Sequence, residues 1–337
     1  MTDGRQGDRY RLHRRALLLA AGGANLLAAP TASATGAPLK APPTPASVPA
    51  AWSAAPVLPL WPGRMPGEGE FRPQPISKTW PLVFIRNTER PMLRVFRPRR
   101  ANGGCVLVIP GGGYLFVSIA NEGVDVAERL AALGYTVFVL TYRLPSEGWS
   151  ARADVPLQDA QRAMRVIRAR ARDYGCDPAR VAAVGFSAGG HLAASLATGA
   201  DEAVYAPVDA LDARSARPAA VGLIYPVVTL TKPHGHAYSR ALLLGTDETA
   251  DRAAQRSPEL HVDAATPPIF LAHACDDRVV PVENSLMMLA ACRAARRPVE
   301  AHLFQEGDHA FGVGFPGSPS GLWIDQFHFW LQRAGLT

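Results

Sequence analysis

The sequence of 337 residues predicts an α/β fold in which helices cover both faces of a mostly parallel sheet. From residue 82 onward, short apolar runs alternate with longer segments in which apolar residues recur at helical spacing. Most of the short runs are apolar throughout, as expected of strands that are buried on both faces. The chain is also long enough to bury a large core, and one domain of about 250 residues accounts for most of it.

The predicted elements follow from this alternation. The strands, many of them rich in Val, Ile and aromatic residues, are 82–86, Met92–Phe96, Cys105–Ile109, 135–141, 181–184, 220–225, 269–273 and Val299–Phe304. The helices are 121–133, 154–174, 191–198, 283–295 and 321–334. Functional residues of such sheets gather in the loops after the strands, at their carboxyl ends.

Residues 1–34 are predicted to be an export signal. Basic residues end at Arg14-Arg15, an apolar run spans 16–29, and Ala32-Ser33-Ala34 matches a cleavage site. The paired arginines favour twin-arginine export of a folded bacterial protein, with general secretion as the alternative. A membrane anchor is less favoured because the run is short and contains two glycines and an asparagine. We therefore expect a periplasmic or extracellular protein without stable membrane anchoring after cleavage.

Residues 35–80 are predicted to form a linker and an extended arm, ahead of a catalytic domain at 81–337. The segment contains many prolines and few charges, and proline resists both helices and central strands. Large apolar residues such as Trp61 and Trp80 would let the arm from Leu60 onward pack on the domain.

Charge and cysteine content exclude several functions. Half of the formal net charge of +6 comes from residues 1–34, and the remainder is too small to indicate nucleic-acid binding. The cysteines are too far apart in the sequence for a metal cluster, and nothing else indicates a metal or organic cofactor; they are Cys105, Cys176, Cys275 and Cys292. Cys105 and Cys275 are expected to be buried as small apolar residues. One disulfide is possible in an exported protein, but we expect none.

The segment Gly185-Phe186-Ser187-Ala188-Gly189 predicts a serine nucleophile. It lies between an apolar strand and a helix, as the sharp strand-to-helix turn of such nucleophiles requires. Side chains at the two glycines would collide with the neighbouring strand and helix. The amides of the helix N-terminus would face the negative charge that develops in acyl transfer. The alternative is an ordinary glycine-rich turn.

The serine needs a base and an orienting carboxylate, which follow it in the order acid, then histidine. His309 fits the base, because it lies in a glycine-containing loop just after the strand Val299–Phe304. Asp276 and Asp277 both follow the strand 269–273. Adjacent side chains point in different directions, so one of the two is expected to orient the histidine, and spacing leaves both open.

A glycine-rich turn after the strand Cys105–Ile109 predicts an oxyanion hole. Its glycines let backbone amides approach a substrate oxygen closely. The expected donors are the amides of Gly112, Gly113 and Ala188, with Tyr114 beside them in the substrate-binding turn.

Six segments together resemble the α/β-hydrolase esterases, and more closely their bacterial carbohydrate-esterase branch; they are 109–114, 140–145, 154–168, 185–197, 273–285 and 303–314. This branch includes acetylxylan esterase-like and feruloyl esterase-like proteins that are often xylanase-associated, and the resemblance covers Leu60 to the C-terminus. Family members carry the catalytic aspartate four residues after the histidine that closes the strand. The resemblance therefore implies Asp277, four residues after His273.

The resemblance implies a secreted serine esterase that removes acyl groups, acetyl above all, from plant polysaccharide or oligosaccharide. Ser187 would be the nucleophile, His309 the general base and acid, and Asp277 the residue that orients the imidazole. One alternative is a serine peptidase of the same fold, although the chain lacks room for the added domain that such enzymes often have. The other is a non-catalytic carbohydrate-binding relic, which the intact set of three residues argues against.

Overall fold

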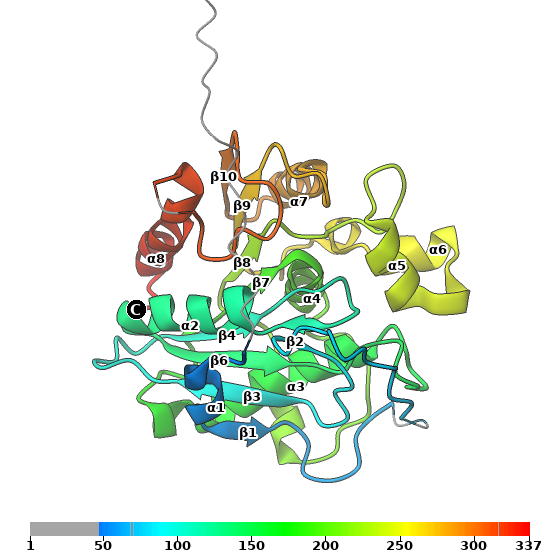
Figure 1. Ribbon diagram of the computed structural model, residues 1–337. Helices are drawn as coiled ribbons and strands as arrows, with labels where there is room; N and C mark the ends of the chain where they lie inside the picture. Colours follow the sequence, from blue (N-terminus) through cyan, green and yellow to red (C-terminus); the bar gives the residue numbers. More distant parts are fainter. Residues whose placement is uncertain (1–46, 68, 70, 316) are drawn as a thin grey trace, which may run out of the picture. The chain divides into compact units, whose positions relative to one another are not determined.

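The computed structural model describes residues 47–67, 69, 71–315 and 317–337 (Figure 1). The predicted export signal at 1–34 and the first part of the predicted linker lie outside these residues. None of the described helices is both long and apolar enough to cross a membrane.

Eight strands form one sheet in the order β1-β3-β6-β4-β7-β8-β9-β10 (Figure 1). Their bounds are β1 Val57–Pro59, β3 Met92–Phe96, β4 Cys105–Ile109, β6 Thr136–Thr141, β7 Val181–Phe186, β8 Val221–Ile224, β9 Ile269–Ala274 and β10 Val299–Phe304. The pairs β1–β3 and β3–β6 are antiparallel, and every pair from β6 to β10 is parallel. Every residue of β4, β6, β7, β8 and β9 is buried, which explains their continuous apolar runs. The predicted mostly parallel sheet is confirmed.

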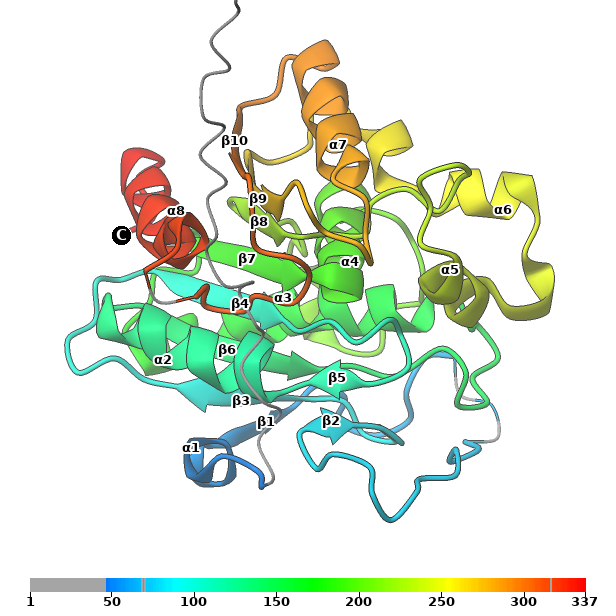
Figure 2. The ribbon, with the colours of Figure 1, turned by 45° about the horizontal axis from the view of Figure 1, so that its top comes forward.

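Helices cover both faces of the sheet (Figures 1 and 2). The main ones are α2 Asp125–Ala132, α3 Val155–Arg170, α4 Ser187–Thr198, α7 Glu283–Ala294 and α8 Trp323–Arg333. The β4–α2–β6 connection runs toward β1, whereas the connections through α3, α4 and α7 run toward β10. Right-handed crossovers therefore place α2 on one face and the other three helices on the opposite face. The Phe327 ring of α8 packs on Phe270 of β9, with 5.3 Å between the ring centroids.

Several elements differ from the prediction. The predicted strand 82–86 is only β2, Phe84–Ile85, which pairs antiparallel with β5, Val117–Ser118, in a separate two-stranded sheet. Short helices that were not predicted are α1 Ala50–Ala54, α5 Ala237–Leu244 and α6 Ala250–Gln255. The predicted helix 121–133 begins as a π-helical turn at Ala120–Val124. Short 3₁₀ turns lie at Ala171–Tyr174, Ala210–Ala213, Gly245–Asp247, Pro258–His261 and Pro319–Leu322.

The proline-rich segment packs against the sheet and α3. Strand β1 lies at the edge of the sheet, the position in which a proline such as Pro59 is tolerated. Leu60 and Trp61 are 1% and 4% exposed. The Trp61 indole N–H donates to Asp159 Oδ1 of α3 at 2.8 Å, and that carboxylate is also paired with Arg143. The segment from Leu60 therefore contributes side chains to the core.

All four cysteines are free thiols. Cys105, Cys176 and Cys292 are buried, but Cys275 is exposed. The prediction that Cys275 is buried was wrong, because β9 ends at Ala274 and Cys275 begins the following loop.

Candidate active site

Ser187 lies on the turn between β7 and α4. Its φ is +50°, while Phe186 before it is extended at −121°. A left-handed conformation is uncommon for a residue other than glycine and is found where neighbouring structure imposes it. The turn requires glycine on both sides, since a Cβ at Gly185 would collide with the Gly189 carbonyl oxygen and a Cβ at Gly189 with that of Ile109. The backbone thus presents the serine hydroxyl at the carboxyl end of the sheet.

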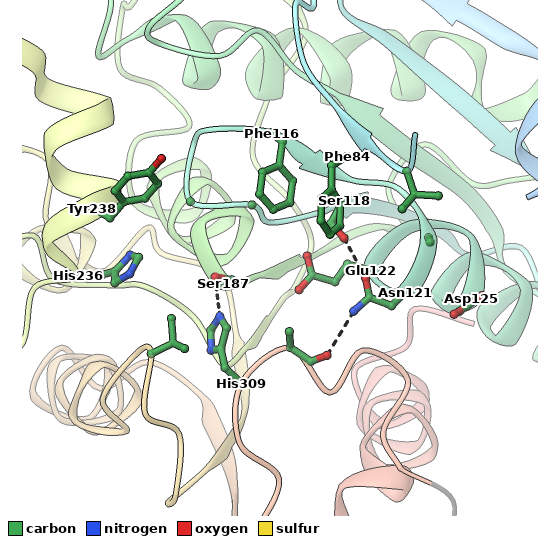
Figure 3. Close-up of a pocket in the computed structure, with 16 residues that line it drawn as sticks. Phe84, Phe116, Ser118, Asn121, Glu122, Asp125, Ser187, His236, Tyr238 and His309 are labelled. Atoms are coloured by element: carbon green, nitrogen blue, oxygen red, sulfur yellow. Dashed lines mark hydrogen bonds between the residues drawn. The ribbon is translucent and has the colours of Figure 1, made fainter. Parts of the chain in front are cut away.

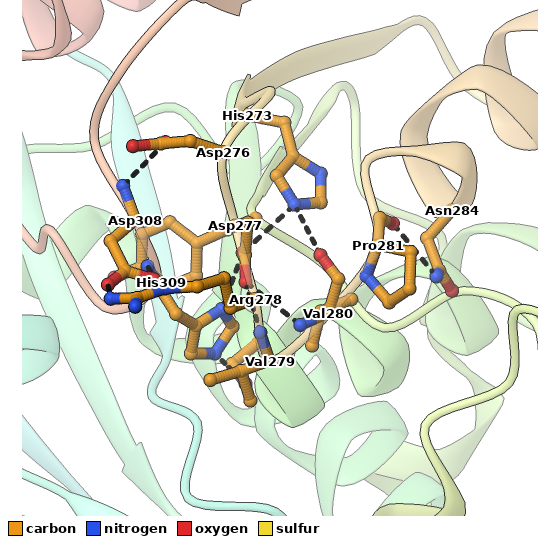
Figure 4. Close-up of polar contacts among 12 residues, drawn as sticks. His273, Asp276, Asp277, Arg278, Val279, Val280, Pro281, Asn284, Asp308 and His309 are labelled. Atoms are coloured by element: carbon orange, nitrogen blue, oxygen red, sulfur yellow. Dashed lines mark hydrogen bonds and ion pairs between the residues drawn. The ribbon is translucent and has the colours of Figure 1, made fainter.

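The structure brings His309 and Asp277 to this serine. Ser187 Oγ lies 2.9 Å from His309 Nε2 (Figure 3), and His309 Nδ1 lies 2.7 Å from Asp277 Oδ2 (Figure 4). The aspartate follows β9 and the histidine follows β10, so parallel strands deliver all three groups to one edge. A carboxylate only accepts hydrogen bonds, so the Nδ1 proton points to Asp277 and Nε2 is free to accept from the serine hydroxyl.

Asp277 is held as an anionic acceptor. Its Oδ1 accepts hydrogen bonds from the amides of Val279 and Val280, both at 2.9 Å, and its Oδ2 also accepts from His273 Nε2 at 3.1 Å (Figure 4). Burial raises the pKa of Asp277, but the hydrogen bonds from His273 and His309 outweigh it, and the net pKa lies well below its ordinary value. The carboxylate therefore remains charged and oriented.

Asp276, the other candidate, has a different contact. Its Oδ1 accepts from the backbone amide of Asp308 at 2.8 Å (Figure 4). It is therefore Asp277, and not Asp276, that accepts the hydrogen bond from His309.

The glycine-rich turn lies beside Ser187. Gly112 and Gly113, with φ of +130° and +63°, line the pocket that contains the serine. Ala188 is buried in the first turn of α4, where backbone amides have no intrahelical partner. The Tyr114 side chain is 1% exposed and does not line the pocket; its hydroxyl lies 2.8 Å from His191 Nδ1. Tyr114 thus contacts α4 through its side chain.

The pocket above Ser187 has a volume of about 540 Å³ (Figure 3). The stacked rings of Phe84 and Phe116 form part of its wall, with centroids 4.2 Å apart. His236 and Tyr238, from the segment after β8, lie on the other side of Ser187 in Figure 3. The pocket therefore combines apolar walls with a few polar groups, as small-molecule sites usually do.

Sequence reasoning missed Glu122 and Tyr225. Glu122 is buried at the pocket wall and hydrogen-bonded to Gly111, and the Tyr225 ring packs edge-on against His309 with centroids 5.0 Å apart. Tyr225 had a usable signal, because it is the last residue of the predicted strand 220–225 and functional residues gather at the carboxyl ends of such strands. Glu122 had none, because an acidic residue near a predicted helix start ordinarily interacts with the helix dipole.

In the described part of the chain, we find no group of three or more His, Cys, Asp or Glu side chains that could bind a metal ion.

A serine on the turn from a parallel strand to a helix, with histidine and aspartate in later loops, is typical of α/β hydrolases. The fold and the site thus define an α/β hydrolase, and several of its relatives are named as esterases. The chain belongs to the BD-FAE family, whose profile matches residues 93–291.

Two curated relatives and one solved structure illustrate the similarity. The chain is 37% identical over 209 residues to a protein named endo-1,4-beta-xylanase B from Butyrivibrio fibrisolvens, covering 62% of this chain and 32% of that one. It is 30% identical over 226 residues to an acetylxylan esterase from Xylanibacter ruminicola, covering 65% and 43%. The chain thus spans less than half of either relative. An acetyl ester-xyloside bifunctional hydrolase from Caldicellulosiruptor lactoaceticus superposes with a TM-score of 0.71 at 30% identity, covering 84% of this chain and 97% of that one.

Proposed function

We propose that the chain is an exported serine esterase that removes acetyl groups from plant polysaccharide or oligosaccharide. The observation that carries the proposal is the hydrogen-bonded series Ser187–His309–Asp277, in which Ser187 and His309 line a pocket. A serine hydroxyl is a weak nucleophile at neutral pH, and this arrangement supplies both the base and the group that orients it.

In the proposed acylation step, Ser187 Oγ attacks the ester carbonyl carbon while His309 Nε2 takes the hydroxyl proton. Asp277 stabilises the imidazolium that forms. The amides of Gly112, Gly113 and Ala188 would bind the oxyanion, and one such donor is typically worth about 3–4 kcal/mol of transition-state stabilisation. The imidazolium then protonates the departing sugar hydroxyl, which leaves an acetyl-serine.

In the proposed deacylation step, His309 removes a proton from water, and the resulting nucleophile attacks the acetyl carbonyl of Ser187. The tetrahedral intermediate uses the same oxyanion donors. Its collapse returns the proton to Ser187 and releases acetate.

The substrate class rests on two supports. The matched relatives include proteins named for acetylxylan and acetyl ester-xyloside hydrolysis. The pocket wall includes the stacked rings of Phe84 and Phe116, an apolar surface that suits the apolar face of a sugar ring, beside polar groups such as His236 that suit its hydroxyls.

The test combines active-site labelling with a substrate panel. A serine-reactive fluorophosphonate should label Ser187 in the folded protein and fail to label Ser187→Ala. Acetylated xylan fragments and aryl acetates should be hydrolysed, with feruloyl esters, longer acyl esters and peptide amides turned over at least about tenfold more slowly. Absence of both labelling and ester hydrolysis would overturn the esterase proposal, and preference for peptide amides or long acyl chains would overturn the substrate class.

Export is tested separately on the full chain in a bacterial host. We expect the mature protein outside the cytoplasm and its loss from that fraction when Arg14-Arg15 is changed to Lys-Lys. Export that survives this change would indicate general secretion instead. Full-length protein retained in the cytoplasm would contradict the proposed signal.

A further inference from the structure

Glu122 is a buried carboxyl group next to the proposed nucleophile (Figure 3). It lies in the π-helical turn Ala120–Val124, between β5 and α2, and is 3% exposed. Burial raises its pKa, partly offset by the hydrogen bond from the Gly111 amide. Keeping such a group in an apolar interior is costly unless its hydrogen bonds are satisfied. The burial of the Glu122 carboxyl group therefore needs a structural or functional explanation.

The contacts of Glu122 join the two loops of the site. Its Oε2 accepts from the Gly111 amide at 2.7 Å, and its Oε1 accepts from the Tyr225 hydroxyl at 3.0 Å. The Tyr225 oxygen in turn accepts from the Gly312 amide at 3.1 Å. A continuous series of hydrogen bonds thus runs from the residue before Gly112 to the third residue after His309.

The histidine loop needs such support because its backbone is strained. Asp308 and Ala310, on either side of His309, have φ of +48° and +59°. Each such residue costs about 1–3 kcal/mol and persists only where surrounding contacts impose it. The π-helical turn holds this loop at a second point, since Asn121 Nδ2 donates to the Ala310 carbonyl oxygen at 3.2 Å. Turns of this kind are frequent at functional sites.

We propose that Glu122 is a positioning residue that acts through Tyr225 to hold the histidine loop against the oxyanion turn, so that His309 stays within hydrogen-bond reach of Ser187. Both oxygens of Glu122 are occupied by Gly111 and Tyr225, so the carboxyl group acts on the geometry of the site and takes no part in the bond changes. The inference rests on the proposed esterase function, because it assigns a role within that reaction.

Two substitutions interrupt the series at different places. Glu122→Gln keeps the side-chain shape but replaces one acceptor oxygen with a donor. When its amide oxygen accepts from Gly111, its amide nitrogen faces the Tyr225 oxygen, and the proton of the Tyr225 hydroxyl loses its acceptor. Tyr225→Phe keeps the ring against His309 but removes the hydroxyl that links Gly312 to Glu122. The matched controls are Glu128→Gln, an exposed residue of α2, and Tyr135→Phe, whose hydroxyl bonds His328 away from the site.

Kinetics are measured with 4-nitrophenyl acetate well below the melting temperature of each variant. Glu122→Gln and Tyr225→Phe should each lower kcat about 10- to 100-fold with KM changed less than about threefold, because a displaced base affects the chemical step more than binding. The kcat of the double variant should lie within about twofold of that of the slower single variant, since both changes break the same series of hydrogen bonds. The rate of Ser187 labelling by a fluorophosphonate should fall in parallel, and both controls should keep wild-type kcat.

Two outcomes would overturn the inference while leaving the esterase proposal intact. One is a kcat within about twofold of wild type in either variant despite a lowered melting temperature, which would indicate a purely structural role. The other is a double variant whose loss equals the product of the two single losses. If Glu122→Gln does not fold, the inference is tested by comparing the kcat of Tyr225→Phe with that of its control, Tyr135→Phe. Wild-type protein that neither hydrolyses esters nor becomes labelled would overturn the proposed function and this inference with it.

Discussion

At the scale of single residues, the orientation of a side chain determines its role in the site. Asp276 and Asp277 are neighbours of identical chemistry, yet one accepts from the amide of Asp308 and the other from the imidazole of His309. Asp277 is also the better enclosed of the two, because four hydrogen bonds converge on its oxygens. The two aspartates should therefore respond differently to the same substitution.

We predict that Asp277→Asn lowers kcat for an acetyl ester by about 10³- to 10⁴-fold, because an amide in place of the carboxylate no longer favours the productive tautomer of His309. Asp276→Asn should lower kcat by less than about tenfold, since the amide oxygen can still accept from Asp308. Steady-state kinetics of the two purified variants check this. A larger loss for Asp276→Asn would reverse the assignment.

His191 predicts a pH dependence of stability. Burial lowers its pKa to about 4, so the folded protein keeps it neutral, with Nε2 facing the Arg256 carbonyl oxygen at 2.7 Å. At pH values between about 4 and the ordinary pKa of 6.5, His191 binds a proton in the unfolded chain but not in the folded protein. The free energy of unfolding therefore falls as the pH falls. The loss is about 1.4 kcal/mol per pH unit and, over this window, at most about 3–4 kcal/mol.

The measurement is the free energy of unfolding in urea for wild type and His191→Gln, at pH values from about 4 to about 7. The stability advantage of the wild type should be greatest near pH 7 and shrink as the pH falls through this window. An advantage that does not change with pH would contradict the prediction.

At the scale of elements, the turn between β7 and α4 depends on close backbone approach to β4. A Cβ at Gly189 would collide with the carbonyl oxygens of Ile109 and Pro110. These atoms belong to the end of β4 and the start of the oxyanion turn, so the collision would displace the serine and the oxyanion donors relative to each other.

We predict that Gly189→Ala destabilises the protein by about 1–3 kcal/mol through overpacking and abolishes measurable esterase activity. The matched control is Gly63→Ala, where no heavy atom beyond the adjacent residues lies within 4 Å of the added carbon and activity should be unchanged. Thermal unfolding and acetyl ester hydrolysis are compared in the two variants. Gly189→Ala with wild-type activity would show that the turn tolerates the displacement.

At the scale of the whole molecule, the segment from Leu60, which precedes the mostly parallel part of the sheet in the sequence, contributes to the core. Trp61 is buried, donates to Asp159 of α3, and packs edge-on against Tyr205 with ring centroids 5.1 Å apart. The Asp159 carboxylate is itself paired with the buried Arg143 at 2.8 Å. Removing the indole would therefore leave a cavity and take one hydrogen bond from a buried ion pair.

We predict that Trp61→Ala lowers the free energy of unfolding by about 3–5 kcal/mol. Val57→Ala, in the neighbouring strand β1, should cost less than about 0.5 kcal/mol, because Val57 is 44% exposed. The free energies of unfolding of both variants, measured in urea, test this prediction. A loss below about 1 kcal/mol for Trp61→Ala would mean that the segment from Leu60 contributes little to the core.

Local patterns in the sequence were enough for much of the fold. The strand Cys105–Ile109 was predicted with its observed bounds, because all of its residues are buried and its apolar pattern needs no knowledge of its neighbours. Strand β2 was predicted too long and in the wrong sheet, and α5 and α6 were missed, because packing against distant residues shapes such short elements.

The sequence by itself determined the mostly parallel α/β fold and the candidates Ser187 and His309, since strand periodicity and the glycines of a tight turn are local properties of the chain. It left Asp276 and Asp277 equivalent on spacing, and it contained no signal for Glu122. Only the tertiary structure decided which carboxylate meets His309 and joined Glu122 to Tyr225. The physical reason is that hydrogen bonds between loops depend on the direction and separation of side chains, which the packing of distant strands determines.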